Sequence, residues 1–340
     1  MKTIKMLGEK QISVIDVPMP ELKEGRMLAK ILASAVCGSE RPLWDRTKEE
    51  NKDTLNFGHE AVCEIIDPNG SKKWKAGDRA CIQIIPYCGE CYYCKHGVPG
   101  MCINKQKNGT VACHSQYVSL LEQCFIPIDK DIAPEIGALL GGDLMGVSRR
   151  STRQLPIKAG EWVLVSGAGP VGLGNIFMLK HLGAKVFVSE PSPMRREFAK
   201  KRAGADIVMD PVTEDVYSEL MKLTGGVGPE ISIECSGNPK AESQLLDWTR
   251  KQGHVMFCGE NYDGLTIIPS HQIIHKELNV HGTFYFEPSD VPEILEQYRN
   301  GLNPEKLISN IVKIEDAPAV MNDFFAGKTG GKVIILPNAE

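Results

Sequence analysis

The chain has 340 residues, a net charge of −4, and 42% hydrophobic and 24% charged residues. This length allows two domains around sizeable cores, and the composition is that of an ordinary globular protein. The charges form no basic stripe, so we expect no nucleic-acid partner.

The first 25 residues carry scattered charges and lack the apolar stretch of a secretory signal, so we expect a cytoplasmic protein. The following stretch, to about residue 140, consists of short apolar runs separated by Gly, Pro and Asp. Runs of this length predict the strands of a mostly β domain. The clearest predicted strands are Met27–Ala35, Ala61–Ile66, Arg79–Ile85 and Tyr117–Leu121.

Potential metal ligands lie among these strands. Cys37 stands in Cys-Gly-Ser-Glu and His59 in Gly-His-Glu. Either residue alone more often serves packing, but together they offer a thiolate and an imidazole, both suited to zinc. A catalytic zinc needs three protein ligands and one open position, and either Glu60 or Asp143 could supply the third. Asp143 follows two glycines, so it could instead cap a helix.

Four more cysteines are closely spaced between residues 86 and 104. The pattern is C-x2-C-x2-C-x7-C, formed by Cys88, Cys91, Cys94 and Cys102. Four thiolates at this spacing can complete a tetrahedral shell around one zinc and leave no open position, which predicts a structural site. An iron–sulfur cluster is the alternative, because it also uses four closely spaced cysteines.

The pattern changes after Pro156, where predicted strands and helices alternate. Such alternation indicates βαβ units and a parallel sheet. The uncharged stretch Trp162–Leu179 is long enough for a membrane span. Because it contains four glycines and a proline, we interpret it as strand, turn and helix, and expect no membrane association. The later predicted elements include a helix over Asp215–Leu223, an apolar strand near Val280–Phe286 and a final strand over Lys332–Leu336.

A glycine-rich motif joins the first strand and helix of this region. Gly167, Gly169 and Gly172 form G-x-G-x-x-G, and Pro170 and Val171 open the predicted helix. In the dinucleotide fingerprint, these glycines permit a tight turn, close approach of a pyrophosphate, and helix–strand packing. An acidic residue should end the second strand and hold the ribose, and Glu190 lies there, 18 residues after Gly172. A purely structural βαβ turn is the alternative.

The order of these motifs resembles the zinc-containing medium-chain dehydrogenase family. Cys-Gly-Ser-Glu, Gly-His-Glu, Gly77-Asp78-Arg79, the four-cysteine segment and the glycine motif follow one another as in that family. Further matches are Glu234-Cys235-Ser236-Gly237, and Lys276-Glu277-Leu278 followed by Gly282. The resemblance covers essentially the whole chain.

The resemblance implies an α/β protein with two domains. A GroES-like, mostly β catalytic domain would span 1–145 and include the structural zinc lobe at 86–104. A Rossmann domain with a doubly wound parallel sheet would span 146–286, and 287–340 would return to the catalytic domain. The cleft between the domains would hold the active site.

The resemblance also assigns roles to individual residues. It makes Cys37, His59 and Asp143 ligands of a catalytic zinc, with Glu60 as a further ligand in the polyol-type branch. Ser39 matches the hydroxyl of the family's proton relay. The relay is in doubt beyond Ser39, because Pro42 stands where the family often has His. Trp44 either lies near the cleft or packs in the core.

The implied reaction is hydride transfer between NAD and a secondary alcohol or polyol, aided by one of two zinc ions per chain. A threonine-like amino-alcohol, or a sugar- or inositol-like ring, is an alternative substrate. A zinc-free quinone-reductase-like enzyme and a non-catalytic crystallin-like scaffold are disfavoured, because both ligand sets are present. We also expect a homodimer or homotetramer, partly joined through the Rossmann sheets near Val280–Phe286.

Cofactor preference depends on the end of the second Rossmann strand. Glu190 would accept hydrogen bonds from the adenine ribose and repel a 2′-phosphate, so we predict NAD in preference to NADP. Arg195 and Arg196 follow on the next predicted helix. We expect them to face solvent or stack on the adenine, with Arg195 as the candidate cofactor contact.

Overall fold

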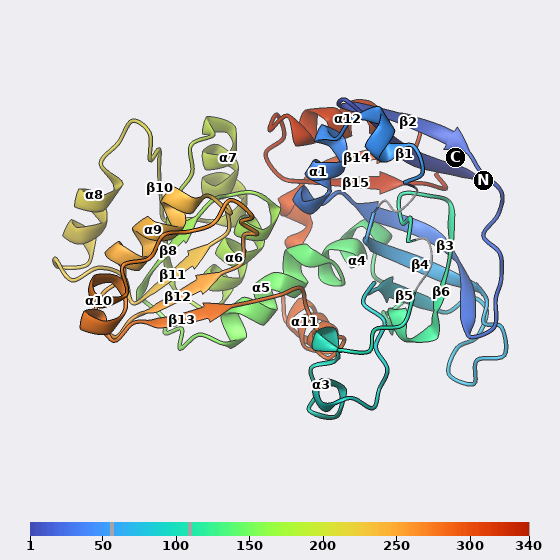
Figure 1. The fold of residues 1–340 in the computed structure, drawn as a ribbon, viewed down its shortest axis with the longest axis horizontal. Coiled ribbons are helices and arrows are strands. Elements are labelled where there is room, and N and C mark those ends of the chain that lie inside the picture. The colour runs from blue at the N-terminus through green and yellow to red at the C-terminus, as the bar shows by residue number, and fades with distance from the viewer. Residues whose placement is uncertain (55–57, 108–110, 340) are drawn as a thin grey trace. The chain divides into compact units, whose positions relative to one another are not determined.

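The computed structural model describes residues 1–54, 58–107 and 111–339 (Figure 1). The chain divides into two compact units. The first contains residues 1–146 and 286–340, and the second contains residues 147–285. Helix α5 (Asp143–Arg153) leads from the first unit into the second.

The first unit is built around a mixed sheet with the strand order β14-β15-β3-β4-β5-β7, in which β6 also pairs with β3. A separate antiparallel hairpin, β1-β2, completes its strands. The two strands from the C-terminal segment lie at one end of this order, so the end of the chain returns to the domain that the beginning builds. The strands are β1 (Lys2–Gly8), β2 (Gln11–Asp16), β3 (Arg26–Ala35), β4 (Glu60–Asp67), β5 (Arg79–Ile82), β6 (Tyr117–Leu121), β7 (Phe125–Pro127), β14 (Ile308–Lys313) and β15 (Lys332–Leu336).

The side chains of β3 alternate between buried and partly buried positions, so one face of this strand packs in the core. Met27, Ala29 and Ile31 are buried, while the residues between them are only partly buried. Their side chains share one face of the strand because successive residues of a strand point to opposite faces. This face packs with Ile65 and Leu120 in one hydrophobic core.

The helices of the first unit are mostly short and surround the sheet (Figure 1). The most C-terminal of them, α12, contributes to a second core in which Phe325 packs against Trp44 with ring centroids 5.8 Å apart. These helices are η1 (Gly38–Glu40), α1 (Arg41–Asp45), α2 (Lys48–Asn51), α3 (Tyr92–Lys95), η2 (Pro99–Met101), η3 (Glu122–Cys124), α4 (Pro134–Leu140), α11 (Asp290–Arg299), η6 (Pro304–Leu307) and α12 (Ala317–Phe325).

The second unit contains a six-stranded, wholly parallel sheet. Its order is β10-β9-β8-β11-β12-β13, which is 3-2-1-4-5-6 in the order of the chain. This is the doubly wound Rossmann order, whose switch point lies between β8 and β11. The strands are β8 (Trp162–Ser166), β9 (Lys185–Ser189), β10 (Ile207–Met209), β11 (Ile231–Glu234), β12 (His254–Phe257) and β13 (Asn279–Gly282).

The connections between these strands carry the helices. Helix α8 begins where its sequence predicts, because the Asp215 carboxylate accepts a 3.0 Å hydrogen bond from the Ser218 N–H and caps the helix. The helices are α6 (Pro170–His181), α7 (Pro193–Phe198), η4 (Ala199–Ala203), α8 (Val216–Leu223), α9 (Pro239–Trp248), α10 (Pro269–Gln272) and η5 (Ile274–Lys276).

The two units confirm the predicted fold class, but two predicted strands are too long. Strand β5 stops at Ile82, after which the Gln83 side chain accepts a hydrogen bond from the Ile85 N–H and turns the chain. Strand β13 stops at Gly282, and the positive φ of Tyr285 (54°) then bends the backbone away from extended geometry. The uncharged stretch forms β8 and α6, and no helix of the described residues could span a membrane.

Candidate zinc and cofactor sites

The four clustered cysteines form a compact group in the first unit. The Sγ–Sγ distances are 3.9 Å for Cys88–Cys94, 3.5 Å for Cys91–Cys94, 3.8 Å for Cys91–Cys102 and 3.5 Å for Cys88–Cys102. A tetrahedron with metal–sulfur bonds of about 2.3 Å has edges of about 3.8 Å, so the group has the size of a zinc shell.

The local backbone favours the thiolates of Cys88 and Cys91, whereas burial and the hydrogen bond with Cys91 raise the pKa of Cys94 to about 12. The Cys91 N–H donates to Cys88 Sγ at 3.3 Å, and the Cys88 N–H donates to Cys102 Sγ at the same distance. Hydrogen bonds from the backbone of Cys94 and Ile103 lower the pKa of Cys91 to about 6. Because a thiolate, and not a thiol, binds metal, these donors prepare the loop to hold zinc.

The other predicted ligands converge at the end of β3, although they are distant in the sequence. Strand β3 pairs with β4 so that Ala35 lies opposite Glu60, which places Cys37 beside His59. Asp143, the first residue of α5, completes the group. Ligand atoms of Cys37, His59, Glu60 and Asp143 all lie within 4.8 Å of one another.

Asp143 points into this group. Its Oδ2 atom lies 3.2 Å from Cys37 Sγ and 3.0 Å from His59 Nε2. Its Oδ1 atom is buried and has no hydrogen-bond partner among the described residues. A buried polar atom without a partner costs about 1–3 kcal/mol, so a cation between these side chains fits the observed arrangement. This placement favours a ligand role for the Asp143 carboxylate over helix capping.

Glu60 is held differently. Its Oε1 atom pairs with Lys332 of β15, and its Oε2 atom accepts a 2.9 Å hydrogen bond from the Asp143 N–H. Both members of the Glu60–Lys332 pair are completely buried. Burial raises the pKa of Glu60 to about 7, although the charge of Lys332 opposes this effect. In this arrangement both carboxylate oxygens of Glu60 have partners, and one of them holds the backbone N–H of Asp143.

Ser39 lies at the rim of the site. It belongs to η1, is exposed, and its hydroxyl donates to Cys37 Sγ at 3.3 Å. A proton taken up by this hydroxyl can therefore pass directly to water. Trp44, for which sequence left two possibilities open, is buried in the core, and its indole N–H donates to the Asn322 side chain at 2.7 Å. The packing interpretation of Trp44 is thus the correct one.

In the second unit, the glycine motif forms the turn between β8 and α6. Gly167 has a φ of +86°, which favours glycine. A Cβ on Gly172 would lie 2.1 Å from the Gly167 oxygen, so only glycine lets α6 approach the loop this closely. A Cβ on Gly169 would meet nothing within 4 Å. Pro170 and Val171 open α6, and the free N–H groups of such a helix start suit a phosphate.

Glu190 follows β9 and reaches back to this turn. Its Oε2 atom accepts a 2.7 Å hydrogen bond from the Ala168 N–H, and its Oε1 atom accepts one of 2.8 Å from the Ser192 N–H. Each carboxylate oxygen has a second lone pair for a ribose hydroxyl. Arg196 donates to the Glu190 and Pro191 carbonyls and pairs with Asp210.

Three residues of the first site were not assigned a role from the sequence. Lys332 opens an otherwise apolar strand, which could have marked it as a buried charge in need of a partner. Glu40 belongs to the quoted Cys-Gly-Ser-Glu motif but received no role. His114 carried no recognisable signal. All three lie in the first unit, around Cys37 and His59.

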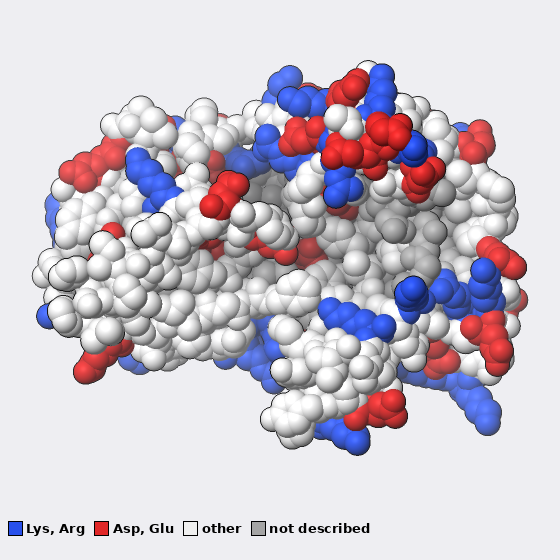
Figure 2. Space-filling view, viewed as in Figure 1, with Lys and Arg blue, Asp and Glu red and all other residues white. Residues whose placement is uncertain are grey.

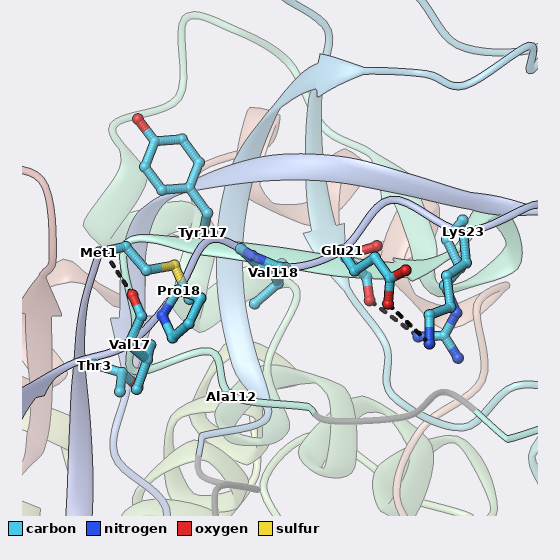
Figure 3. Close-up of a pocket in the computed structure, with 12 residues that line it drawn as sticks. Met1, Thr3, Val17, Pro18, Glu21, Lys23, Ala112, Tyr117 and Val118 are labelled. Atoms are coloured by element: carbon cyan, nitrogen blue, oxygen red, sulfur yellow. Dashed lines mark hydrogen bonds and ion pairs between the residues drawn. The ribbon is translucent and has the colours of Figure 1, made fainter.

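A groove of about 370 Å³ also opens in the first unit, along the N-terminal strand and β6 (Figure 3). It is lined by Met1, Val17, Pro18 and Tyr117, among others, and an ion pair between Lys23 and Glu21 lies at one end. None of the candidate ligands lines this groove. The groove is therefore separate from the candidate zinc ligands.

Comparison with known proteins gives the class of this chain. Residues 23–130 match the alcohol dehydrogenase GroES-like domain, and residues 170–300 match the zinc-binding dehydrogenase domain. The L-threonine 3-dehydrogenase of Pyrococcus horikoshii is 33% identical over 99% of this chain and 97% of that protein. The chain therefore belongs to the zinc-binding dehydrogenases of the medium-chain type, and it is an oxidoreductase, as the sequence predicts.

Other relatives agree with this class. The scyllo-inosose 3-dehydrogenase of Thermotoga maritima is 26% identical over 96% of this chain and 90% of that protein. The crystal structure of (2R,3R)-butanediol dehydrogenase from Bacillus subtilis superposes with a TM-score of 0.84 at 24% identity, covering 99% of both chains. This superposition supports the fold. The predicted zinc dependence is in keeping with the zinc-binding dehydrogenase match, and the predicted alcohol or polyol oxidation with the dehydrogenase relatives.

Proposed function

We propose that this enzyme oxidises a secondary alcohol to a ketone with NAD, using a zinc ion held by Cys37, His59 and Asp143. The observation that carries the proposal is the convergence of these side chains around the unpartnered Oδ1 atom of Asp143. Thiolate, imidazole and carboxylate groups each bind zinc, and three protein ligands leave the open position that a catalytic zinc needs. The four clustered cysteines would hold a second, structural zinc.

In this proposal, bound zinc supplies a Lewis acid for the substrate oxygen, and bound NAD supplies the hydride acceptor. The chain's own residues position the reactants and move the proton. Ser39 accepts the proton of the substrate hydroxyl and passes it to water, because its hydroxyl is both next to Cys37 and exposed. Asp143 and Glu60 place two carboxylates near the reacting centre, and Lys332 balances part of their charge.

The same reasoning assigns the cofactor site to the glycine turn. Gly169 leaves room for the pyrophosphate, and Glu190 presents its carboxylate for the ribose hydroxyls. Arg196 is already engaged by backbone carbonyls and Asp210, which favours NAD over NADP. Arg195 is partly buried and has no side-chain hydrogen bond or ion pair with the residues described, so it is the cation available to the adenine end.

A threonine-like amino-alcohol is the second candidate substrate class. It is favoured because the relatives named L-threonine 3-dehydrogenase reach 33–34% identity, whereas the scyllo-inosose relative reaches 26%. The site contains two carboxylates beside Cys37, which could also attract an ammonium group. The simple alcohol and the amino-alcohol differ only in the group beside the reacting carbon.

We further propose a cytoplasmic homo-oligomer. The described residues form no disulfide, as expected in a reducing compartment. Strand β13 is an edge of the Rossmann sheet, and Val280 and Phe284 expose 44% and 48% of their surfaces. Figure 2 shows few charged side chains over α10 and β13, whereas both signs intermingle over β1, β2 and α12. An exposed edge strand with exposed apolar side chains on it and just after it is suited to pairing with a second copy.

A substrate panel tests the proposed function. NADH formation is followed at saturating NAD with L-threonine, 2,3-butanediol, sorbitol and an inositol as separate substrates. The proposal predicts turnover of at least one of them and none by the Cys37→Ala variant. Turnover of L-threonine alone would select the amino-alcohol class. An unchanged rate for Cys37→Ala would contradict the proposed site.

A further inference from the structure

A chain of buried polar side chains lies behind His59. The Nδ1 atom of His59 is 3.4 Å from Glu40 Oε1, and the Nε2 atom of His114 is 3.3 Å from Glu40 Oε2. The Ser34 hydroxyl lies 2.8 Å from Nδ1 of His114. Ser34 and His114 are completely buried, and Glu40 is 4% exposed. Burying a polar group costs free energy unless it has a hydrogen-bond partner, so each of these side chains depends on its neighbours in this series.

The contacts determine which atoms carry protons. Each carboxylate oxygen of Glu40 faces a ring nitrogen of one histidine, with Oε1 facing His59 and Oε2 facing His114. A carboxylate accepts, so His114 donates its Nε2–H to Glu40 Oε2. His59 Nδ1 lies within ion-pair distance of Glu40 Oε1, without hydrogen-bond geometry in this structure. When Nε2 of His59 binds a metal, the ring proton is on Nδ1, the atom that faces Glu40, while Nε2 faces Cys37 and Asp143.

The same logic applies to His114. Because its Nε2 atom donates to Glu40, the Nδ1 atom of the neutral ring accepts the hydrogen bond that the Ser34 hydroxyl donates. Ser34 thus fixes the tautomer of His114 that Glu40 requires. Packing holds the ring in place as well, since a Cβ on Gly58 would lie 2.7 Å from the His114 backbone nitrogen and 2.8 Å from its ring. Gly58 directly precedes His59.

We propose that His114 is a positioning residue that, together with Ser34, fixes Glu40 so that Glu40 holds His59 with its Nε2 atom directed at the metal. The inference rests on the proposed zinc site, because His59 must be a ligand for its orientation to matter. His114 touches neither substrate nor metal in this account. Without it, one buried oxygen of Glu40 would lose its partner, and the carboxylate would be free to turn away from His59.

Three variants separate hydrogen bonding from packing. His114→Phe keeps a ring of similar size but removes both hydrogen bonds. His114→Gln keeps an Nε2 donor that can reach Glu40. Cys113→Ala is the matched control, because Cys113 is the buried neighbour of His114 and packs in a hydrophobic cluster. Each full-length variant is purified with zinc, and its unfolding midpoint is measured before any other test.

The first readout is zinc retention during dialysis against increasing chelator, with Cys37→Ala as the baseline for loss of the proposed catalytic zinc. Outer partners of metal-ligating histidines contribute about 10- to 100-fold in metal affinity. We expect His114→Phe to lose the catalytic-site zinc at correspondingly lower chelator concentrations. His114→Gln should recover most of the affinity, and Cys113→Ala should match the unmodified protein.

The second readout is the visible absorption spectrum of protein in which Co²⁺ replaces the zinc of the Cys37 site. This is the zinc that the Cys37→Ala variant does not bind. A changed His59 orientation should shift this spectrum in His114→Phe and restore it in His114→Gln, with kcat falling more than KM changes. If folded His114→Phe keeps normal zinc retention and an unchanged spectrum, the inference is overturned while the zinc site stands. Equal defects in His114→Phe and His114→Gln would also overturn it, because packing alone would then explain them.

If His114→Phe does not fold, His114→Gln and Ser34→Ala are compared in its place. Ser34→Ala removes the donor that fixes the tautomer and should lower zinc retention in the same direction. Normal zinc retention in Ser34→Ala, together with reduced zinc retention in His114→Gln, would overturn the proposed role of Ser34 and His114. If the unmodified protein binds no zinc that depends on Cys37, the proposed function itself fails, and this outcome is distinct from all the others.

Discussion

The Nε2 atom of His59 lies 3.0 Å from the Oδ2 atom of Asp143, although the two residues are 84 positions apart in the chain. Two elements create this proximity: His59 immediately precedes β4, and Asp143 opens α5. Burial and the positive charge of His59 act on the Asp143 carboxyl in opposite directions, and the net effect is a lowered pKa. Asp143 is therefore ready to act as an anionic ligand.

The first prediction concerns this carboxylate. Asp143→Asn removes the anionic oxygen but keeps the size of the side chain. Loss of a residue that hydrogen-bonds to a metal ligand typically costs about 10- to 100-fold. We expect kcat/KM of Asp143→Asn to fall by more than this, because a direct ligand is lost. Asp129→Asn, which removes an exposed partner of Arg299 in the same unit, is the matched control. Equal rates in both variants would exclude Asp143 from the site.

The second prediction concerns the buried Glu60–Lys332 pair. Glu60→Gln leaves the Lys332 ammonium buried without its counter-ion, and loss of one partner of such a pair costs about 3–5 kcal/mol. Denaturant unfolding should show this loss, and adding Lys332→Met should recover part of it. Glu315→Gln breaks the exposed pair with Lys2 and should change stability by less than about 1 kcal/mol. A Glu60→Gln variant as stable as Glu315→Gln would show that the pair does not support the site.

The third prediction separates two glycines of the cofactor turn. Gly172→Ala places a Cβ against the Gly167 oxygen and should lower the unfolding midpoint. Gly169→Ala fits the backbone, whose φ is −66°, and should leave stability unchanged while raising KM for NAD. Differential scanning calorimetry and initial rates measure the two effects. A stable Gly172→Ala variant, or normal KM in Gly169→Ala, would contradict this assignment.

The fourth prediction concerns cofactor choice. The unmodified enzyme should favour NAD over NADP in kcat/KM by at least about tenfold, since one unfavourable charge contact of about 1.4 kcal/mol gives this ratio. Glu190→Ala should narrow the gap by weakening NAD and admitting NADP. Arg195→Ala should weaken both cofactors.

Arg196→Ala serves as the comparison, because Arg196 is anchored to the Glu190 and Pro191 carbonyls. It should mainly lower stability and leave the NAD-to-NADP ratio unchanged. Better use of NADP than NAD by the unmodified protein would mean that the arginines reach the 2′-phosphate and that Glu190 does not decide the preference.

The sequence is most informative where short-range patterns determine geometry. The glycine motif predicts the turn between β8 and α6, because close approach there excludes any side chain at Gly172. The spacing of the four cysteines places them on one short loop, where they form a group of zinc-binding size. In both cases the residues that must meet are near neighbours in the chain.

Long-range partners are harder to predict from one sequence. His114 meets Glu40 across 74 residues, and Lys332 meets Glu60 across 272, so no local pattern announces either contact. The chain's return into the first sheet creates the second contact, because β15 pairs with β3 beside β4. The backbone bend at Tyr285 is similarly hidden, since a positive φ in a bulky residue depends on its surroundings.

The most direct test of the account is zinc content measured together with turnover. The unmodified protein should bind one zinc at each of the two groups, and Cys37→Ala should retain only the zinc of the four cysteines and produce no NADH. After chelator removes the Cys37-dependent zinc, activity should disappear and return in proportion to the zinc added back. Full NADH production by protein that lacks this zinc would contradict the central claim.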